Sequence, residues 1–173
     1  MKCFKIESIE YGWFDFRIGK HYFIASDYLG YDMPKEFLDK LIKVLKESSK
    51  EWLYVMNEPG ATIIELTSVD DTTISIQSYS MNKPSDALSP NIEEEIKNKG
   101  ACDFSISIAK LDLTDDVITE YSLYETGNGR KYYEFNWGTF PQSEYNELKK
   151  MAFEENKKLN ELESLKCIDF LEL

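Results

Sequence analysis

Histidine and cysteine are the side chains that most often carry acid–base, nucleophilic or zinc chemistry near neutral pH. The chain has one histidine, His21, and three widely spaced cysteines, Cys3, Cys102 and Cys167. A single imidazole gives no convincing Ser-His-Asp or Cys-His arrangement, and the cysteines lack the paired short spacing of zinc or redox motifs. We therefore expect His21 to be structural or simply exposed, and the cysteines to be reduced and mostly buried.

Carboxylates and glycine-rich loops are the other routes to metal, glycosidase or nucleotide chemistry. Asp70-Asp71 and Asp115-Asp116 lack the spacing of a calcium loop, and they fit a turn and a helix start. With 32 acidic residues, chance alone brings carboxylate pairs together, so their abundance is no evidence for glycoside cleavage. No glycine run has the spacing of a phosphate-binding loop. We expect no catalytic residue, no metal site and no cofactor, and hence a protein that is not an enzyme.

Net charge is the most informative bulk property of the chain. The 32 acidic and 20 basic residues give a formal net charge of −12. Such a surface repels phosphate backbones, so the sequence predicts no nucleic-acid binding. The same field attracts a basic protein and speeds its association. Solubility alone is the alternative explanation of the acidity.

An acidic and aromatic cluster stands out near the N-terminus as a candidate site for binding a partner protein. Its members are Asp15, Tyr22, Asp27, Tyr28, Tyr31 and Asp32. Tyrosines supply large rigid contact areas, and neighbouring carboxylates can pair with arginine or lysine of a partner. In the alternative interpretation, Tyr28 and Leu29 fill the core while Asp27 and Asp32 cap turns.

Length and composition indicate one folded domain over residues 1–173. The chain is 42% hydrophobic and contains 10 Phe, 11 Tyr and 3 Trp, which is enough to build a substantial core. It has no apolar run of about 18 residues, and its first residues alternate charged with apolar types. We expect a cytoplasmic protein without a membrane segment.

Hydrophobic periodicity predicts strands and one secure helix in the first half of the chain. Phe14, Phe16 and Ile18 alternate with charged residues, and Gly19-Lys20 forms a two-residue turn. The predicted strands are 2–10, 13–18, 21–25, 52–56, 61–69 and 72–80, and the helix is 34–48. The polar segment 82–90 is a connector, followed at 91–99 by a short acidic helix or a loop.

The second half of the chain is predicted from the same signals. We expect a strand over 103–113 with a bulge near Ala109-Lys110, a helix over 114–125 that stops at 127–129, and a strand over 131–137. A long helix over 141–165 and an edge strand over 167–173 complete the chain. The predicted fold is α+β: a mainly antiparallel sheet of six or seven strands with helices 34–48 and 141–165 packed on one face.

Four segments distributed along the chain carry a resemblance to a known class of protein. They are Gly12-Trp13-Phe14-Asp15-Phe16, Ala25-Ser26-Asp27-Tyr28-Leu29-Gly30, Glu58-Pro59-Gly60 and Trp137-Gly138-Thr139-Phe140-Pro141. In these segments the chain resembles the small acidic immunity proteins that bacteria encode beside polymorphic or contact-dependent toxins. The resemblance implies a cytosolic protein that binds a basic cognate toxin domain and blocks it, and it assigns no functional residue.

Two functions from other classes remain open on the sequence. One is a small hydrolase or ligand-binding enzyme with a carboxylate site in a deep pocket. The other is a scaffold that self-associates through its aromatic surface. A pocket with converging acids would favour the enzyme, whereas a flat or grooved acidic patch with exposed tyrosines would favour a protein partner.

Overall fold

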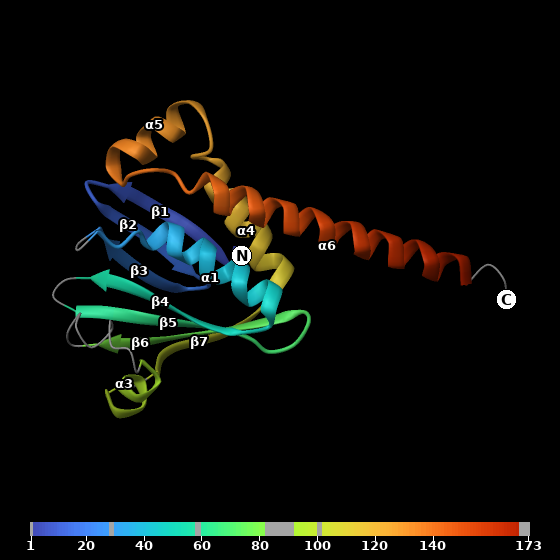
Figure 1. Ribbon diagram of the computed structural model, residues 1–173, viewed down its shortest axis with the longest axis horizontal. Helices are drawn as coiled ribbons and strands as arrows, with labels where there is room; N and C mark the ends of the chain where they lie inside the picture. Colours follow the sequence, from blue (N-terminus) through green and yellow to red (C-terminus); the bar gives the residue numbers. More distant parts are fainter. Residues whose placement is uncertain (1, 28–29, 58–59, 82–91, 100–101, 170–173) are drawn as a thin grey trace.

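The computed structural model describes residues 2–27, 30–57, 60–81, 92–99 and 102–169, of which Lys99 and 159–169 are described by their backbone alone (Figure 1). The strands are β1 (Phe4–Glu10), β2 (Trp13–Ile18), β3 (His21–Ser26), β4 (Lys50–Asn57), β5 (Gly60–Ser68), β6 (Thr73–Met81) and β7 (Cys102–Ala109). The helices are α1 (Met33–Glu47), α3 (Ile92–Lys99), α4 (Lys110–Ser122), α5 (Gly127–Asn136) and α6 (Gln142–Asp169). The predicted connector 82–90 lies outside the described residues.

The strands form two antiparallel sheets, with the orders β1-β2-β3 and β4-β5-β6-β7. The α+β class and the antiparallel pairing are confirmed, but the prediction of a single six- or seven-stranded sheet is wrong. Between β3 and β4 the structure shows a side-chain hydrogen bond, from Ser26 Oγ to the carbonyl of Met56 at 3.2 Å, instead of a ladder. Alternation of side chains identifies a strand, but it does not say which strand pairs with which.

The two sheets share the main core with helices α1, α4, α5 and α6. At one end of β3, Ser26 contacts β4 through Met56. At the other end the His21 ring stacks on Phe104 of β7, with ring centroids 4.7 Å apart and planes at 24°. Phe23 approaches the same Phe104 ring edge-on at 6.3 Å. Strand β3 therefore contacts both edge strands of the second sheet, β4 through Ser26 and β7 through His21 and Phe23.

The helices pack differently from the prediction, although α1 and α6 themselves are confirmed. Helix α1 packs on β4 and β5, while α6 packs on α1 and α4 and then extends beyond the body of the protein (Figure 1). The two long helices therefore do not share one face of a sheet. Helix α3, the short acidic helix, packs Ile92 and Ile96 on the opposite face of the second sheet, against Ile63.

The chain after β6 departs most from the prediction. The change of alternation near Ala109-Lys110 marks the junction of β7 with α4 and not a bulge. In the first turn of α4 the Thr114 hydroxyl donates to the Lys110 carbonyl at 2.7 Å. The predicted strand 131–137 is helix α5, because Tyr133 and Trp137 also satisfy helical spacing: the Trp137 N–H donates to the Tyr133 carbonyl at 2.8 Å. Gly127, expected as a helix stop, begins α5 with φ +62°.

The C-terminal segment and the cysteines also differ from the prediction. Residues 167–169 continue α6 and form no edge strand; residues 170–173 lie outside the described part of the chain. Cys102 is exposed and Cys3 is half-buried, so the cysteines are not uniformly buried.

Helix α4 covers the outer edge of β1 with two carboxylates. The backbone N–H of Ile6 donates to Glu120 Oε2 at 3.1 Å, and that of Phe4 donates to Asp116 Oδ2 at 3.4 Å. Glu120 is only 3% exposed and also pairs with Lys2, whose Nζ lies 2.5 Å from Oε1. Backbone donors that an edge strand would otherwise leave without protein partners are thus satisfied by side chains.

Candidate functional site

The structure separates the predicted acidic and aromatic cluster into two groups. Asp15 and Tyr22 lie together on the outer face of the first sheet, where Tyr22 Oη donates to Asp15 Oδ2 at 2.7 Å. The Ser8 hydroxyl donates to the same oxygen at 2.9 Å. These hydrogen bonds hold the phenol ring of Tyr22 in a fixed position on the surface.

The second group surrounds the start of α1. Asp32 caps that helix by accepting from the Lys35 N–H at 3.4 Å, and it also accepts from the Trp137 indole N–H at 3.0 Å. Tyr31 is partly buried against Tyr54, whose backbone N–H donates to the Tyr31 hydroxyl at 3.4 Å. Burial raises the pKa of Tyr31. Asp32 and Tyr31 therefore have structural partners.

Asp27 is exposed at the end of the first sheet, and Tyr28 lies outside the described residues. The Asp27 N–H donates to the Gly12 carbonyl at 2.9 Å. The φ of +80° at Gly12 favours glycine, and a Cβ there would lie 2.8 Å from Asp27 Oδ1, so the Asp27 side chain would have to move. With Tyr31, Asp32 and Trp137, Asp27 lines a cavity of about 190 Å³.

Large apolar side chains that sequence reasoning did not place in the site lie beside these groups. Trp13 is 41%, Ile24 40% and Tyr22 48% exposed, and the strand register puts all three on the outer face of the first sheet. At the β1–β2 turn, Tyr11 (84% exposed) donates its N–H to Asn136 Oδ1 at 3.2 Å, and Phe135 (83% exposed) is the residue before Asn136 in α5. Tyr11, Trp13, Tyr22, Ile24 and Phe135 are called the exposed aromatic face below.

A cleft of about 500 Å³ runs along β3, between this strand and the second sheet. Its wall is formed by β3, with Trp13 at the rim, and its floor includes Val55, Thr62 and Ser80, which are paired neighbours on β4, β5 and β6. Asp103 of β7 continues this row and accepts from the Ser80 N–H at 2.8 Å. The floor thus becomes polar where the core between the sheets ends.

The chemistry of the cleft is modest. Asp103 is the one carboxylate among the described residues that line it, and no hydrogen bond joins it to His21. The Asn57 amide donates to Thr62 Oγ1 at 3.4 Å, while its buried Oδ1 has no partner among the described residues. A pair of converging acids, as glycoside cleavage requires, is therefore not found among the described residues of this cleft.

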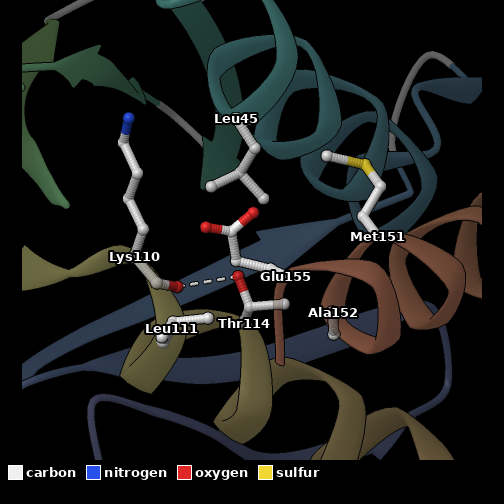
Figure 2. A pocket seen from close by; sticks show the side chains of 7 residues that line it. All are labelled: Leu45, Lys110, Leu111, Thr114, Met151, Ala152 and Glu155. Carbon is white, nitrogen blue, oxygen red and sulfur yellow. Dashed lines mark hydrogen bonds between the residues drawn. The ribbon is translucent and has the colours of Figure 1, made fainter. Parts of the chain in front are cut away.

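A smaller pocket of about 100 Å³ lies where α1, α4 and α6 meet (Figure 2). Leu45, Leu111, Met151 and Ala152 give it a largely apolar lining, and the amine of Lys110 points away to donate to Ser68 Oγ at 2.8 Å. Ligand pockets usually have volumes of about 300–1,000 Å³. This pocket is a packing space between helices.

The described residues contain no group of three or more His, Cys, Asp or Glu side chains placed to hold a metal ion. In the same part of the chain, no helix combines the length and apolar character needed to cross a membrane.

The hydrogen bond between Tyr22 and Asp15 gives a testable pH signature on the exposed aromatic face. This bond to the carboxylate raises the pKa of Tyr22 to about 12. Asp15→Asn is expected to return the Tyr22 pKa toward its ordinary value of about 10, because no negative charge would then oppose the phenolate. Ultraviolet difference titration of wild type, Asp15→Asn and Tyr22→Phe isolates this phenol. Identical curves for the wild type and Asp15→Asn would contradict the assigned contact.

Comparison of the chain with models of protein families, with curated proteins and with solved structures finds no match in any of the three.

Proposed function

We propose that the protein binds a cationic partner protein through the exposed aromatic face and neutralises it by covering its functional surface, as an immunity protein does with a toxin. The observation that carries the proposal is that Trp13, Tyr22 and Ile24 remain 40–48% exposed side by side on one sheet face. Asp15 and Asp27 lie within and beside this face.

The side-chain types fit a binding role better than a purely structural one. Tryptophan and tyrosine are enriched among the residues that dominate the affinity of protein interfaces. The Asp15 carboxylate already orients the Tyr22 ring, so less conformational freedom is lost on binding. Tyr11 and Phe135 extend the apolar area toward α5.

The charge of the protein supports a basic partner. The net charge of −12 attracts a cationic protein over long range and speeds encounter at low salt. Arg17 on the same sheet face is paired with Glu7, with 2.9 Å between Nε and Oε1, and Glu7 also pairs with Lys5, so one of these two positive charges is offset locally. Asp15 and Asp27 then supply the negative field beside the aromatic side chains.

A ligand-binding enzyme is the second candidate, and the cleft along β3 is the observation that favours it. Its volume of about 500 Å³ falls within the usual range of small-molecule pockets. Turnover that depends on His21 and Asp103, which both line this cleft, would support the enzyme and oppose pure masking. Self-association through the exposed aromatic face is the third candidate, and the measured mass of the protein in solution tests it.

The proposal is tested with the partner that the full chain captures from its source cells, once that partner is identified and purified. Trp13→Ala combined with Tyr22→Ala is expected to weaken binding by at least about 30-fold, since central aromatic residues often contribute 2 kcal/mol or more. Val69→Ala with Leu123→Ala is the matched control, because Val69 and Leu123 are also exposed but lie outside this face. Titration calorimetry at two salt concentrations measures both the affinity and its dependence on charge.

Equal affinity of wild type and the Trp13→Ala, Tyr22→Ala variant would overturn the choice of surface. Binding that strengthens as salt is added would oppose the charge argument. Thermal unfolding of each variant establishes that a loss of affinity does not come from a loss of fold.

A further inference from the structure

We propose that the outer edge of β3 is a docking site for an extended, basic segment of the partner protein, which adds to the first sheet as a fourth strand. This inference rests on the proposed function and specifies how the partner is held. Addition of a strand would use backbone hydrogen bonds for affinity and alternate side chains for specificity.

The register of the β2–β3 hairpin shows which backbone groups are open. A two-residue turn, Gly19-Lys20, makes Ile18 and His21 a hydrogen-bonded pair, and such pairs alternate along an antiparallel ladder. The N–H and C=O groups of Tyr22 and Ile24 therefore point away from β2. Among the described residues, none makes a hydrogen bond with these groups.

The other edge of the same sheet is covered, which makes the open edge of β3 distinctive. On β1 the outward N–H groups reach Asp116 and Glu120 of α4. Proteins commonly cover or charge their edge strands because an open edge pairs with other chains. In the described part of this protein, one edge is closed by carboxylates while the other borders a cleft.

The cleft has the position that an added strand would need. His21 and Phe23 of β3 contact Phe104, which pairs with Ser78 in one row of the second sheet. The cleft floor is the next row, Val55, Thr62 and Ser80. Successive rows on one face are about 7 Å apart, and paired strands are about 4.8 Å apart. A strand beside β3 would therefore lie along the cleft, over the end of this floor that is exposed at Ser80, since Val55 and Thr62 are buried.

The charges around the edge of β3 indicate which kind of segment binds there. Asp103 lies on the floor, Asp15 lies beside Tyr22, and Asp27 lies just beyond the end of β3. The nearby cations are Lys20 at the turn and Arg17, which is opposite Tyr22 on β2 and paired with Glu7. A second copy of the chain would bring another net charge of −12 to the same edge, which opposes self-pairing. A partner segment with lysine or arginine at alternate positions is complementary, with its apolar side chains on Trp13 and Ile24.

The inference is tested with the full chain and a library of short random peptides displayed on phage as the probe. Enriched peptides are expected to alternate apolar residues with lysine or arginine. Ile24→Pro removes one open N–H without removing a hydrogen bond of the ladder to β2. It should weaken the binding of a synthetic peptide with an enriched sequence at least about tenfold. Ile24→Val is the matched control and should bind like the wild type.

Two further measurements keep the test independent of how well Ile24→Pro folds. N-methylation of the peptide amides that face β3 should abolish binding, whereas methylation of the alternate amides should not. The amides of Tyr22 and Ile24 should exchange hydrogen quickly in the free protein and become protected by the peptide. Slow exchange without peptide, absence of enrichment, enrichment of acidic peptides, equal binding by both methylated peptides or a dimer joined through β3 would each overturn the inference.

Failure of this inference is distinguishable from failure of the proposed function. If the captured partner loses affinity for Trp13→Ala with Tyr22→Ala but binds Ile24→Pro as it binds Ile24→Val, the partner uses the face without adding a strand. If neither change alters binding of the partner, both proposals are wrong.

Discussion

Replacing Glu120 by alanine is expected to lower the free energy of unfolding by about 3 kcal/mol, because it leaves a buried backbone donor without its acceptor. The Glu120 carboxylate is 3% exposed and accepts from the Ile6 N–H at 3.1 Å and from Lys2. Lys2 is itself exposed to solvent and recovers hydration, so most of the loss comes from the Ile6 amide and the vacated volume. Urea unfolding followed by circular dichroism measures the change.

Glu147→Ala is the matched control, because Glu147 forms an exposed ion pair with Lys46 and such pairs contribute at most about 1 kcal/mol. Glu120→Gln keeps an acceptor for the Ile6 amide, so its free energy of unfolding should lie between those of Glu120→Ala and the wild type. Equal losses for Glu120→Ala and Glu147→Ala would show that α4 does not hold the edge of β1 in the way described. Faster hydrogen exchange at Ile6 in Glu120→Ala would locate the damage.

The parts of the fold that the sequence predicts well are those decided by local pattern. The β2–β3 hairpin and α1 follow from alternation around Gly19-Lys20 and from Pro34 with an apolar stripe, and both form where expected. The α4 contact with β1 could not be predicted, because Glu120 reaches Ile6 only after distant segments pack. The same limit hides the division into two sheets, since Ser26 and Met56 approach without forming a ladder.

The candidate site shows a similar boundary between local and tertiary information. Asp15 and Tyr22 could be grouped from the hairpin, because cross-strand neighbours follow from its turn. The alternation that buries Phe14 also predicts an outward Trp13. The contact of the Tyr11 N–H with Asn136 of α5 could not be predicted, because it joins residues far apart in the sequence.

Helix α5 illustrates why aromatic-rich segments mislead pattern reasoning. Alternate aromatic residues over 131–137 fit a strand, but spacings of three and four fit a helix equally well. In the structure Tyr133 is buried and Phe135 is 83% exposed. The misassigned segment is thus also the one that adds Phe135 to the exposed aromatic face, so an error in the fold became an omission in the site.

Phe37→Ala is expected to have the largest effect on stability of any change discussed, with a loss of about 4 kcal/mol, because truncating a buried phenylalanine removes apolar area and leaves a cavity. Phe37 of α1 is 1% exposed, stacks on Phe4 with ring centroids 5.0 Å apart, and lies 6.3 Å from the Phe16 ring. It joins α1 to the first sheet, while the same helix packs on β4 of the second sheet. Lys43→Ala, on the exposed side of α1, is the control and should change stability by at most about 0.5 kcal/mol.

The same variant tests whether the two sheets unfold together. Buried residues of both sheets belong to one continuous core, so Phe37→Ala should lower the unfolding midpoint equally for probes in each sheet. Fluorescence of Trp13 in the first sheet and Trp52 in the second provides such probes when the other tryptophans are replaced by phenylalanine. If the Trp13 signal shifts and the Trp52 signal does not, the sheets unfold independently. In that case β3 could separate from the second sheet, and the cleft beside it would not have the fixed shape on which strand docking depends.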